Sequence, residues 1–272
     1  MPEIRFVSFA SSNMRPSLDR IRREARASGF FDTIHTYTEH NLEPWYRRQY
    51  ADRFRRYKRG YGYWIWKSHI IKNELDSLKP DDILVYLDAG CTINGEGYDR
   101  FRQYIDYTRL TDVGIVAFQQ KRLLEKHWTR ADLLAHCGAL GDSSITDSGQ
   151  LWAGAHLTRK TPRAEEFIGR WHDLCHNHFN LITDEPSALP NLPGFEENRH
   201  DQSAYSVLLK PYGPYIVDSD ETCSYNDDYA RDLPDKPFWA TRRRQLTWWA
   251  LKKDGLARRW NNITTRLHGL GL

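Results

Sequence analysis

The sequence predicts one α/β domain with a mostly parallel central sheet and helices on both faces. Three observations indicate this class: an opening strand–helix–strand pattern, a hydrophobic strand that ends in a carboxylate, and a composition typical of a single ordered core. The 272 residues are 40% hydrophobic, 13% aromatic and 28% charged, which excludes a disordered chain. We expect one domain over residues 1–245 and a basic, aromatic C-terminal helix over 246–272.

The chain opens with a strand, a helix and a second strand. Ile4–Ala10 is a hydrophobic run that predicts the first strand, and the polar turn 11–13 leads into a helix that begins near Pro16 and ends at Gly29. Thr33–Tyr37 predicts the second strand. Units of this kind are right-handed and open nucleotide-binding folds. The sequence has neither the Gly-x-Gly-x-x-Gly pattern of dinucleotide-binding folds nor a P-loop.

The segment 81–90, Asp-Asp-Ile-Leu-Val-Tyr-Leu-Asp-Ala-Gly, predicts a central parallel strand over Ile83–Leu87. In open α/β sheets, ligands bind beyond the carboxyl ends of the strands. Asp88 is therefore a candidate ligand-binding residue. The alternative is that Asp88 only caps the turn that follows the strand.

An aromatic and glycine-rich block, Arg59-Gly-Tyr-Gly-Tyr-Trp-Ile-Trp-Lys67, lies upstream of that strand. Two glycines between aromatic rings and cations suit a loop where the backbone approaches a ligand closely. The spacing of Tyr63, Trp66 and Ile70 is that of one apolar helix face. We expect a loop over 59–62 and a helix from about Tyr63.

The remaining elements follow from hydrophobic periodicity and turn signals. The predicted helices are a basic one at 43–57 and others at 98–108, 127–135, 165–178 and from Asp201; the predicted strands are 113–118 and the segment 151–157. The run of arginines in 43–57 is interpreted as a solvated helix face. Since no recognised nucleic-acid-binding motif is present, nucleic acid is not an expected partner.

Four segments together resemble the GT-A-fold glycosyltransferases of bacterial capsule and lipopolysaccharide O-antigen biosynthesis. They are the block 59–67, the strand end Asp88-Ala89-Gly90, the stretch Gln150–Gly154 and the helix start His200-Asp-Gln-Ser203. The resemblance implies a GT-A-like fold and the transfer of a hexose, galactose as a first guess, from a UDP-linked sugar donor. The implied acceptor is a lipid-linked polysaccharide or lipopolysaccharide. The alternative is a catalytically inactive carbohydrate-binding or scaffold protein with the same fold.

The resemblance also implies roles for individual residues. Asp201 and Gln202 are the candidate catalytic residues, with Asp201 a general base if the reaction inverts and an acceptor-orienting group if it retains. The plain alternative for Asp201 is a helix cap. The residues expected to bind the donor are Arg59, Tyr63, Lys67, Asp88, Ala89, Gly90, Gly154 and Arg243, and those expected to bind the acceptor are Gln150, Trp152 and His200.

A divalent metal, Mn or Mg, is the cofactor that the resemblance implies, with Asp88 as a ligand. Two expected ligands are missing, because Gly90 stands where the family has a second carboxylate and Thr241 where it has a histidine. The arginines at 242–244 offer another way to neutralise a departing diphosphate. We therefore expect a weak or altered dependence on metal.

The chain is expected to be cytoplasmic, with a peripheral contact to the inner face of the membrane through its C-terminus. Its start lacks the pattern of a signal peptide, no apolar run approaches 18 residues, and the four cysteines have no paired spacing. Residues 240–272 hold eight lysines and arginines against one acid, a net charge of +7 in a chain whose total is +3. Interleaved with tryptophans, these charges are typical of a helix on anionic lipid. A helix docked on the domain is the alternative.

Overall fold

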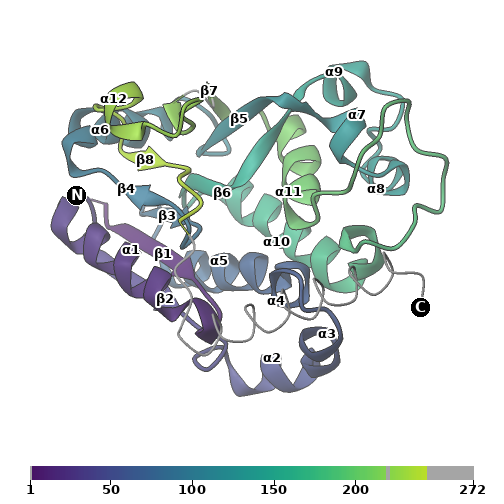
Figure 1. The fold of residues 1–272 in the computed structure, drawn as a ribbon, viewed down its shortest axis with the longest axis horizontal. Coiled ribbons are helices and arrows are strands. Elements are labelled where there is room, and N and C mark those ends of the chain that lie inside the picture. The colour runs from purple at the N-terminus through teal and green to yellow at the C-terminus, as the bar shows by residue number, and fades with distance from the viewer. Residues whose placement is uncertain (1, 219–220, 244–272) are drawn as a thin grey trace, which may run out of the picture.

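The computed structural model describes residues 2–218 and 221–243. The C-terminal helix predicted over 246–272 lies outside this range. The described residues form a six-stranded sheet in the order β2-β1-β3-β6-β5-β7 and a two-stranded ribbon of β4 and β8 (Figure 1). The strands are β1 (Ile4–Phe9), β2 (Thr33–Tyr37), β3 (Ile83–Leu87), β4 (Thr92–Ile93), β5 (Ile115–Leu124), β6 (Gly149–Arg159), β7 (Tyr215–Asp218) and β8 (Phe238–Trp239).

The central sheet is mostly parallel, as predicted. β1 pairs in parallel with both β2 and β3, and β5 pairs in parallel with β7. β6 is antiparallel to both of its neighbours, β3 and β5, so β5 and β7 run in the same direction as β3. One reversed strand therefore lies inside an otherwise parallel sheet.

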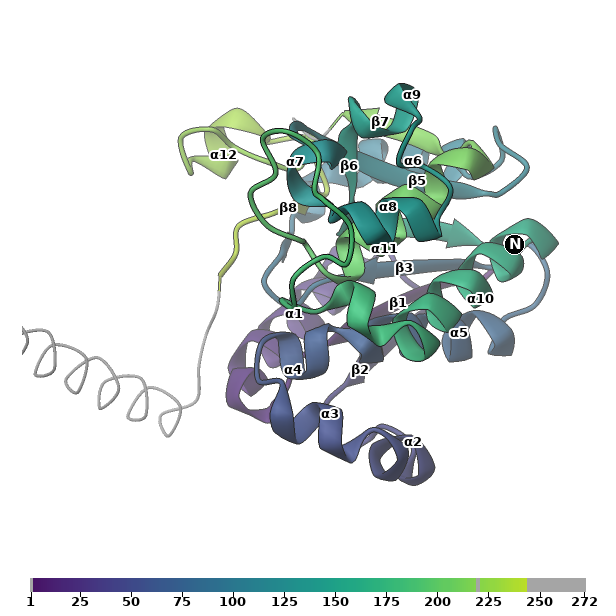
Figure 2. The ribbon, with the colours of Figure 1, turned by 90° about the vertical axis from the view of Figure 1, so that its right-hand side faces the viewer.

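Helices cover both faces of the sheet (Figures 1 and 2). α1 (Arg15–Ser28) and α6 (Tyr98–Tyr107) pack on one face, where Ile21 and Phe101 join side chains such as Val85 in one apolar core. α5 (Ile65–Ser77), α10 (Pro162–Asn177) and α11 (Asp201–Leu209) pack on the other face, around Trp171 and Leu84. Alternate residues of the buried strand β3 supply the two cores.

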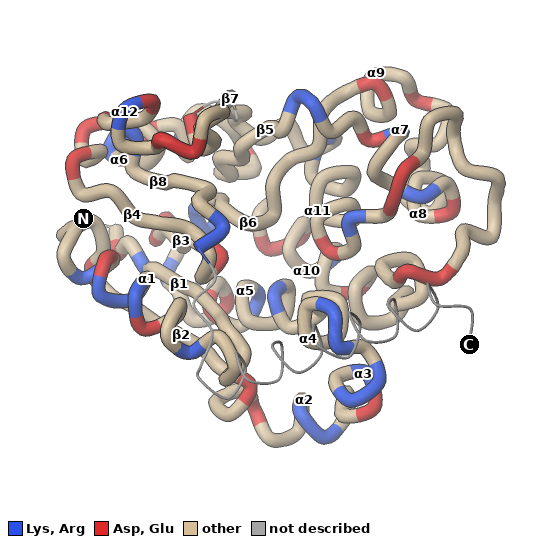
Figure 3. Tube along the Cα trace, in the orientation of Figure 1, with Lys and Arg blue, Asp and Glu red and all other residues tan. Residues whose placement is uncertain are grey.

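The shorter helices lie around this body. They are α2 (Pro44–Gln49), α3 (Ala51–Arg56), α4 (Gly60–Tyr63), α7 (Glu125–Trp128), α8 (Ala131–His136), α9 (Ser143–Thr146) and α12 (Tyr229–Asp232), together with single 3₁₀ turns at Ser12–Met14, Gly95–Gly97, Phe179–Ile182 and Lys210–Tyr212. Lysines and arginines are prominent along α2 and α3 at the lower margin of the molecule, as Figure 3 shows. In the part of the chain that the structure describes, no helix has the length and apolar character needed to cross a bilayer.

Two of the predicted helices are broken. The helix predicted over 43–57 divides into α2 and α3 at Tyr50, whose backbone (φ −106°, ψ 16°) is not helical. The helix predicted over 127–135 divides into α7 and α8 because Thr129 and Arg130 are extended. The buried Arg130 side chain donates to the carbonyls of Glu185 and Pro186 at 2.7 and 2.8 Å, and these bonds fix the bend against the long loop before α11.

Candidate functional site

Asp88 lies at the carboxyl end of β3 and is the more exposed of the two carboxylates that contact Lys67. Its side chain is 36% exposed, and its Oδ1 accepts a hydrogen bond of 2.8 Å from the hydroxyl of Tyr86. Its backbone N–H donates to the carbonyl of Gly154 on the reversed strand β6 at 2.8 Å. The neighbouring strand β6 thus holds the backbone of Asp88, and the Tyr86 hydroxyl holds its carboxylate, part of which faces solvent.

Lys67 places a buried cation between two carboxylates. Its Nζ lies 3.3 Å from Oδ1 of Asp88 and 2.9 Å from Oδ2 of Asp201, and the residue is 3% exposed. Burial acts against the charged form of Lys67, but the two carboxylates, Asp201 before Asp88, outweigh it and raise the pKa of the amine. Lys67 therefore stays an ammonium ion at physiological pH.

Asp201, the first residue of α11, is the second carboxylate that contacts the Lys67 ammonium. The residue is 4% exposed, and burial, opposed by Lys67, raises the pKa of its carboxyl to about 6. Its Oδ2 interacts with Lys67 as an ion pair rather than as an aligned hydrogen bond. His200, with φ 58° and ψ −125°, occupies the N-cap position of α11. Asp201 is therefore not the cap residue, and its carboxylate pairs with Lys67 instead.

Gly154 and the loop after Asp88 pack closely around the carboxylate. A Cβ on Gly154 would lie 2.7 Å from Oδ2 of Asp88 and 2.3 Å from Nε1 of Trp152, so only glycine fits there. The Gly90 carbonyl accepts hydrogen bonds from the hydroxyl of Thr241 at 3.1 Å and the N–H of Arg243 at 2.9 Å. The segment 240–243 is thereby fixed against the loop after Asp88.

Arg20 supports the same loop from α1, and no spacing in the sequence marks it. Its buried guanidinium donates to the carbonyls of Ala89 and Cys91 at 2.9 and 2.8 Å. Since a guanidinium is a rigid donor, these bonds fix the backbone on both sides of Gly90. Ala89, which was predicted to bind the donor, is itself buried, and its carbonyl accepts one of these bonds from Arg20.

Gln150 and Gln202, predicted as acceptor-binding and catalytic, form a pair. The Gln202 amide donates to Oε1 of Gln150 at 2.7 Å, and Gln150 is fully buried. Behind them lies an ion pair that sequence reasoning missed, in which Lys210 is 2.7 Å from the fully buried Glu125. Polar residues on separate helices leave no spacing signal for such a pair. Because Gln150 is fully buried, its hydrogen bond with Gln202 supports the site from the interior of the protein.

Arg59, Tyr63 and His200 gather at a different carboxylate, Asp184. The Arg59 guanidinium lies 2.9 Å from Oδ1, and the Tyr63 hydroxyl donates to Oδ2 at 2.7 Å. Nε2 of His200 lies 3.5 Å from Oδ1, and burial lowers the pKa of this histidine. These three predicted donor- and acceptor-site residues connect the block 59–67 to the long loop before α11.

The residues from Gly60 to Trp64, which include the short element α4, form a left-handed turn. Their φ angles are 58°, 52°, 84°, 52° and 60°, so the run includes three aromatic residues in a region that favours glycine. Each such L-residue costs about 1–2 kcal/mol. Hydrogen bonds hold the turn, including Tyr63 N–H to the Arg59 carbonyl at 2.9 Å and Trp64 N–H to the Gly60 carbonyl at 3.1 Å. The predicted loop is thus an ordered turn, and α5 begins at Ile65 rather than at Tyr63.

Arg199 and Arg242 add unpaired positive charge near the site. The Arg199 guanidinium lies 5.1 Å above the Trp128 ring. Burial and the nearby cations Arg242 and Arg59 lower its pKa. Within residues 2–218 and 221–243, neither Arg199 nor Arg242 forms an ion pair. Glu197 and Asp201 lie near Arg199 but form no direct ion pair with it, so the positive charge of the two arginines stays available to an anionic ligand.

The metal implied by the resemblance does not fit these residues. No three histidine, cysteine, aspartate or glutamate side chains of the described chain are placed to hold a metal ion. Oδ1 of Asp88 already contacts the Lys67 ammonium, and the Gly90 carbonyl already accepts two hydrogen bonds. The hydroxyl of Thr241, in the place of the expected histidine, is 3.0 Å from that of Thr92.

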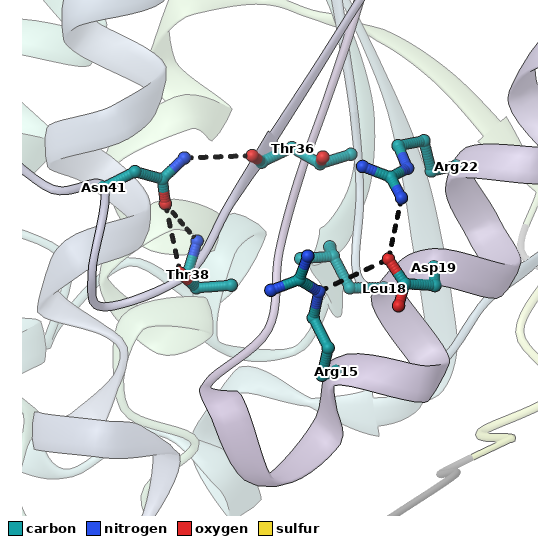
Figure 4. Close-up of a pocket in the computed structure, with 7 residues that line it drawn as sticks. All are labelled: Arg15, Leu18, Asp19, Arg22, Thr36, Thr38 and Asn41. Carbon is teal, nitrogen blue, oxygen red and sulfur yellow. Dashed lines mark hydrogen bonds and ion pairs between the residues drawn. The ribbon is translucent and has the colours of Figure 1, made fainter.

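A separate polar pocket of about 280 Å³ lies between α1 and β2 (Figure 4). Its two arginines, Arg15 and Arg22, both pair with Asp19, at 3.3 and 2.9 Å. The residues that line it are Arg15, Leu18, Asp19, Arg22, Thr36, Thr38 and Asn41. Because its cations are already paired, the pocket offers less to an anion than the arginines beside Asp201.

No family model matches the chain, and no curated protein matches its sequence. Among solved structures, a glycosyltransferase involved in the glycosylation of the major capsid of PBCV-1 is 13% identical, with a TM-score of 0.47 over 88% of this chain and 93% of that one. The glycosyltransferase GlyE of Streptococcus pneumoniae TIGR4 is 12% identical, with a TM-score of 0.43 over 91% of this chain and 56% of that one. The galactosyltransferase LgtC, solved with donor and acceptor sugar analogs, is 13% identical, with a TM-score of 0.47 over 94% of this chain and 95% of that one. Similarity of this degree assigns no activity.

The left-handed turn gives a prediction about stability. A Cβ on Gly60 would lie 2.2 Å from the Trp64 ring, whereas one on Gly213, which has a similar φ of 65°, would meet nothing within 4 Å. Gly60→Ala and Gly213→Ala should therefore share the left-handed cost of about 1–2 kcal/mol. Gly60→Ala should lose about 1–3 kcal/mol more from the clash, measured by urea unfolding. Equal losses would show that the turn relaxes without cost.

Proposed function

We propose that this protein is a glycosyltransferase that moves a hexose from a UDP-linked donor, with galactose as the first sugar to test. One observation carries the proposal. A partly exposed carboxylate, Asp88, stands at the carboxyl edge of a mostly parallel sheet, beside a glycine where only a hydrogen fits, with unpaired arginines close by. This combination provides acceptors for sugar or ribose hydroxyls and cations for a diphosphate.

The reaction breaks the bond between the anomeric carbon and the diphosphate oxygen. The acceptor hydroxyl oxygen forms the new bond and passes its proton to solvent water, while the diphosphate leaves with the electron pair of the broken bond and one added negative charge. Arg199 and Arg242 supply positive charge for that leaving group, since neither forms a direct ion pair with a carboxylate among the described residues. Asp88 accepts hydrogen bonds from donor hydroxyls through Oδ2, the oxygen beside Gly154.

Asp201 has a different role from that of an exposed base. A general base must reach the proton it takes, and Asp201 is 4% exposed with its carboxylate against Lys67. We assign it as a positioning residue that holds Lys67, which in turn holds Asp88. Gln202 lies at the same helix start and orders Gln150 behind the site.

The acceptor in this proposal is a lipid-linked polysaccharide or lipopolysaccharide, which the enzyme meets at the inner face of the membrane. The support is the net charge of +7 in residues 240–272, interleaved with tryptophans. Deleting 246–272 should release the protein from anionic vesicles and leave transfer to a soluble acceptor intact. If the full-length chain does not sediment with anionic vesicles at low salt, the membrane part of the proposal is wrong.

Donor binding tests the proposal directly. UDP and a panel of nucleotide sugars are titrated into the protein by calorimetry, and turnover is followed by donor hydrolysis. Asp88→Asn should weaken binding of the preferred donor by about tenfold or more, because it removes hydrogen bonds to a charged acceptor. Asp99→Asn, at an exposed aspartate in the first turn of α6, is the matched control. Binding without turnover would favour the inactive carbohydrate-binding alternative, and no nucleotide binding would reject the proposal.

The pH dependence of turnover tests Asp201. Its carboxyl, with a pKa of about 6, loses its proton as the pH rises through 6 and only then pairs fully with Lys67. The value of kcat/KM should therefore fall on the acid side of pH 6. Asp201→Asn should lower kcat/KM by about 100-fold, as a small misplacement of a reacting group does, and abolish this acid limb. An acid limb that persists in Asp201→Asn would assign the titration to another group.

A further inference from the structure

We infer that Lys67 is the resident cation of this site and occupies the position of a divalent metal, so that binding and transfer of the donor need no metal. This rests on the proposed function for what the site binds. It concerns a group that the structure shows directly, a buried ammonium in contact with two carboxylates from two different elements.

The contacts of Lys67 are those of a shared counter-ion. Its Nζ lies 3.3 Å from Asp88, which follows β3, and 2.9 Å from Asp201, which begins α11. The ammonium also lies 5.4 Å from the centre of the Tyr86 ring, whose hydroxyl donates to the same oxygen of Asp88. One oxygen of Asp88 is thus fully used, and the other remains beside Gly154.

A divalent metal cannot share this position with the ammonium. Mg²⁺ binds oxygen at about 2.0–2.1 Å, so each carboxylate would have to move in by roughly 1 Å and the ammonium would have to leave. A metal beside the ammonium would instead meet a buried like charge, which is strongly unfavourable where the dielectric constant is low. A third ligand is missing as well among the residues described, since Gly90 presents only a carbonyl that is already bonded.

The left-handed turn sets the position of Lys67. α5 begins directly after Trp64, and the N–H of Lys67 donates to the Trp64 carbonyl at 2.9 Å. Lys67 therefore lies in the first turn of a helix whose start is fixed by the turn and by the contacts of Arg59 and Tyr63 with Asp184. A long side chain that is buried in this way loses the freedom that would let a metal displace it.

The test is a metal-binding measurement that does not depend on turnover. Mn²⁺ is titrated into the wild-type protein, with and without UDP, and bound ion is followed by electron paramagnetic resonance. The wild type should bind no Mn²⁺ at the Asp88 carboxylate. Lys67→Ala should bind Mn²⁺ with a dissociation constant at least tenfold below the highest Mn²⁺ concentration at which the wild type shows no binding, since it frees two carboxylates around an empty space.

Two further variants make the result specific. Lys67→Ala combined with Asp201→Asn should lose the acquired Mn²⁺ binding, because one of the two ligands is gone. Lys72→Ala, at a lysine farther along α5 that pairs with Asp76 at the surface, should behave as the wild type. Circular dichroism establishes that each variant is folded. A folded Lys67→Ala that binds no Mn²⁺ would overturn the assignment of Lys67 to the position of a metal.

Measurements on the wild-type protein alone also test whether the site needs a metal. UDP binding and donor turnover should be unchanged within about twofold by excess EDTA. Mn²⁺ binding to the wild type that is lost in Asp88→Asn, or turnover that EDTA abolishes and Mn²⁺ restores, would overturn the inference. Failure to bind any nucleotide would reject the proposed function instead, while the Mn²⁺ titrations of wild type and Lys67→Ala would still stand as a separate result.

Discussion

The contact of one ammonium with two carboxylates joins the three elements that build the site. Lys67 comes from α5, Asp88 from the end of β3 and Asp201 from the start of α11, and all three charges lie at one point on the edge of the sheet. Burying a lysine is costly, and the cost is offset only because both carboxylates accept it at close range. Removing Lys67 would leave the buried carboxylate of Asp201 without its counter-ion. The packing of α5 and α11 against the sheet therefore depends on the same atoms as the chemistry.

Much of the fold could be predicted from the sequence, because its signals are local. The strand Ile83–Leu87 is a short apolar run between turn residues, and α1 has a proline at its start and a left-handed Gly29 at its end. The breaks in two helices could not be predicted in the same way. The bend at Arg130 depends on carbonyls more than 50 positions away in the chain, and a helical pattern in one segment contains no information about them.

The candidate site, like the fold, could be predicted only in part. Asp88, Lys67, Gly154 and Asp201 were named from the sequence, and the structure brings them together. Their mutual arrangement was not predictable. The block 59–67, which contains Lys67, also contains Arg59 and Tyr63. The side chains of these two residues contact Asp184 instead, because the backbone between them is left-handed. Arg20, Glu125 and Lys210 escaped notice because a buried charge on a helix leaves no periodic signal until its partner is known.

The attachment of the segment 240–243 to Gly90 has a consequence for how the molecule is made. Thr241 and Gly90 are 151 positions apart, and their hydrogen bond closes the loop that follows Asp88. Contacts between distant positions require a large loss of chain entropy before they form, so they come late in folding. On the ribosome, the amino-terminal strands can fold early, yet the loop beside Asp88 lacks this hydrogen bond until Thr241 has emerged. The polypeptide therefore acquires this ligand-facing loop in its final form only after Thr241 is made, and nascent chains that stop short of Thr241 lack it.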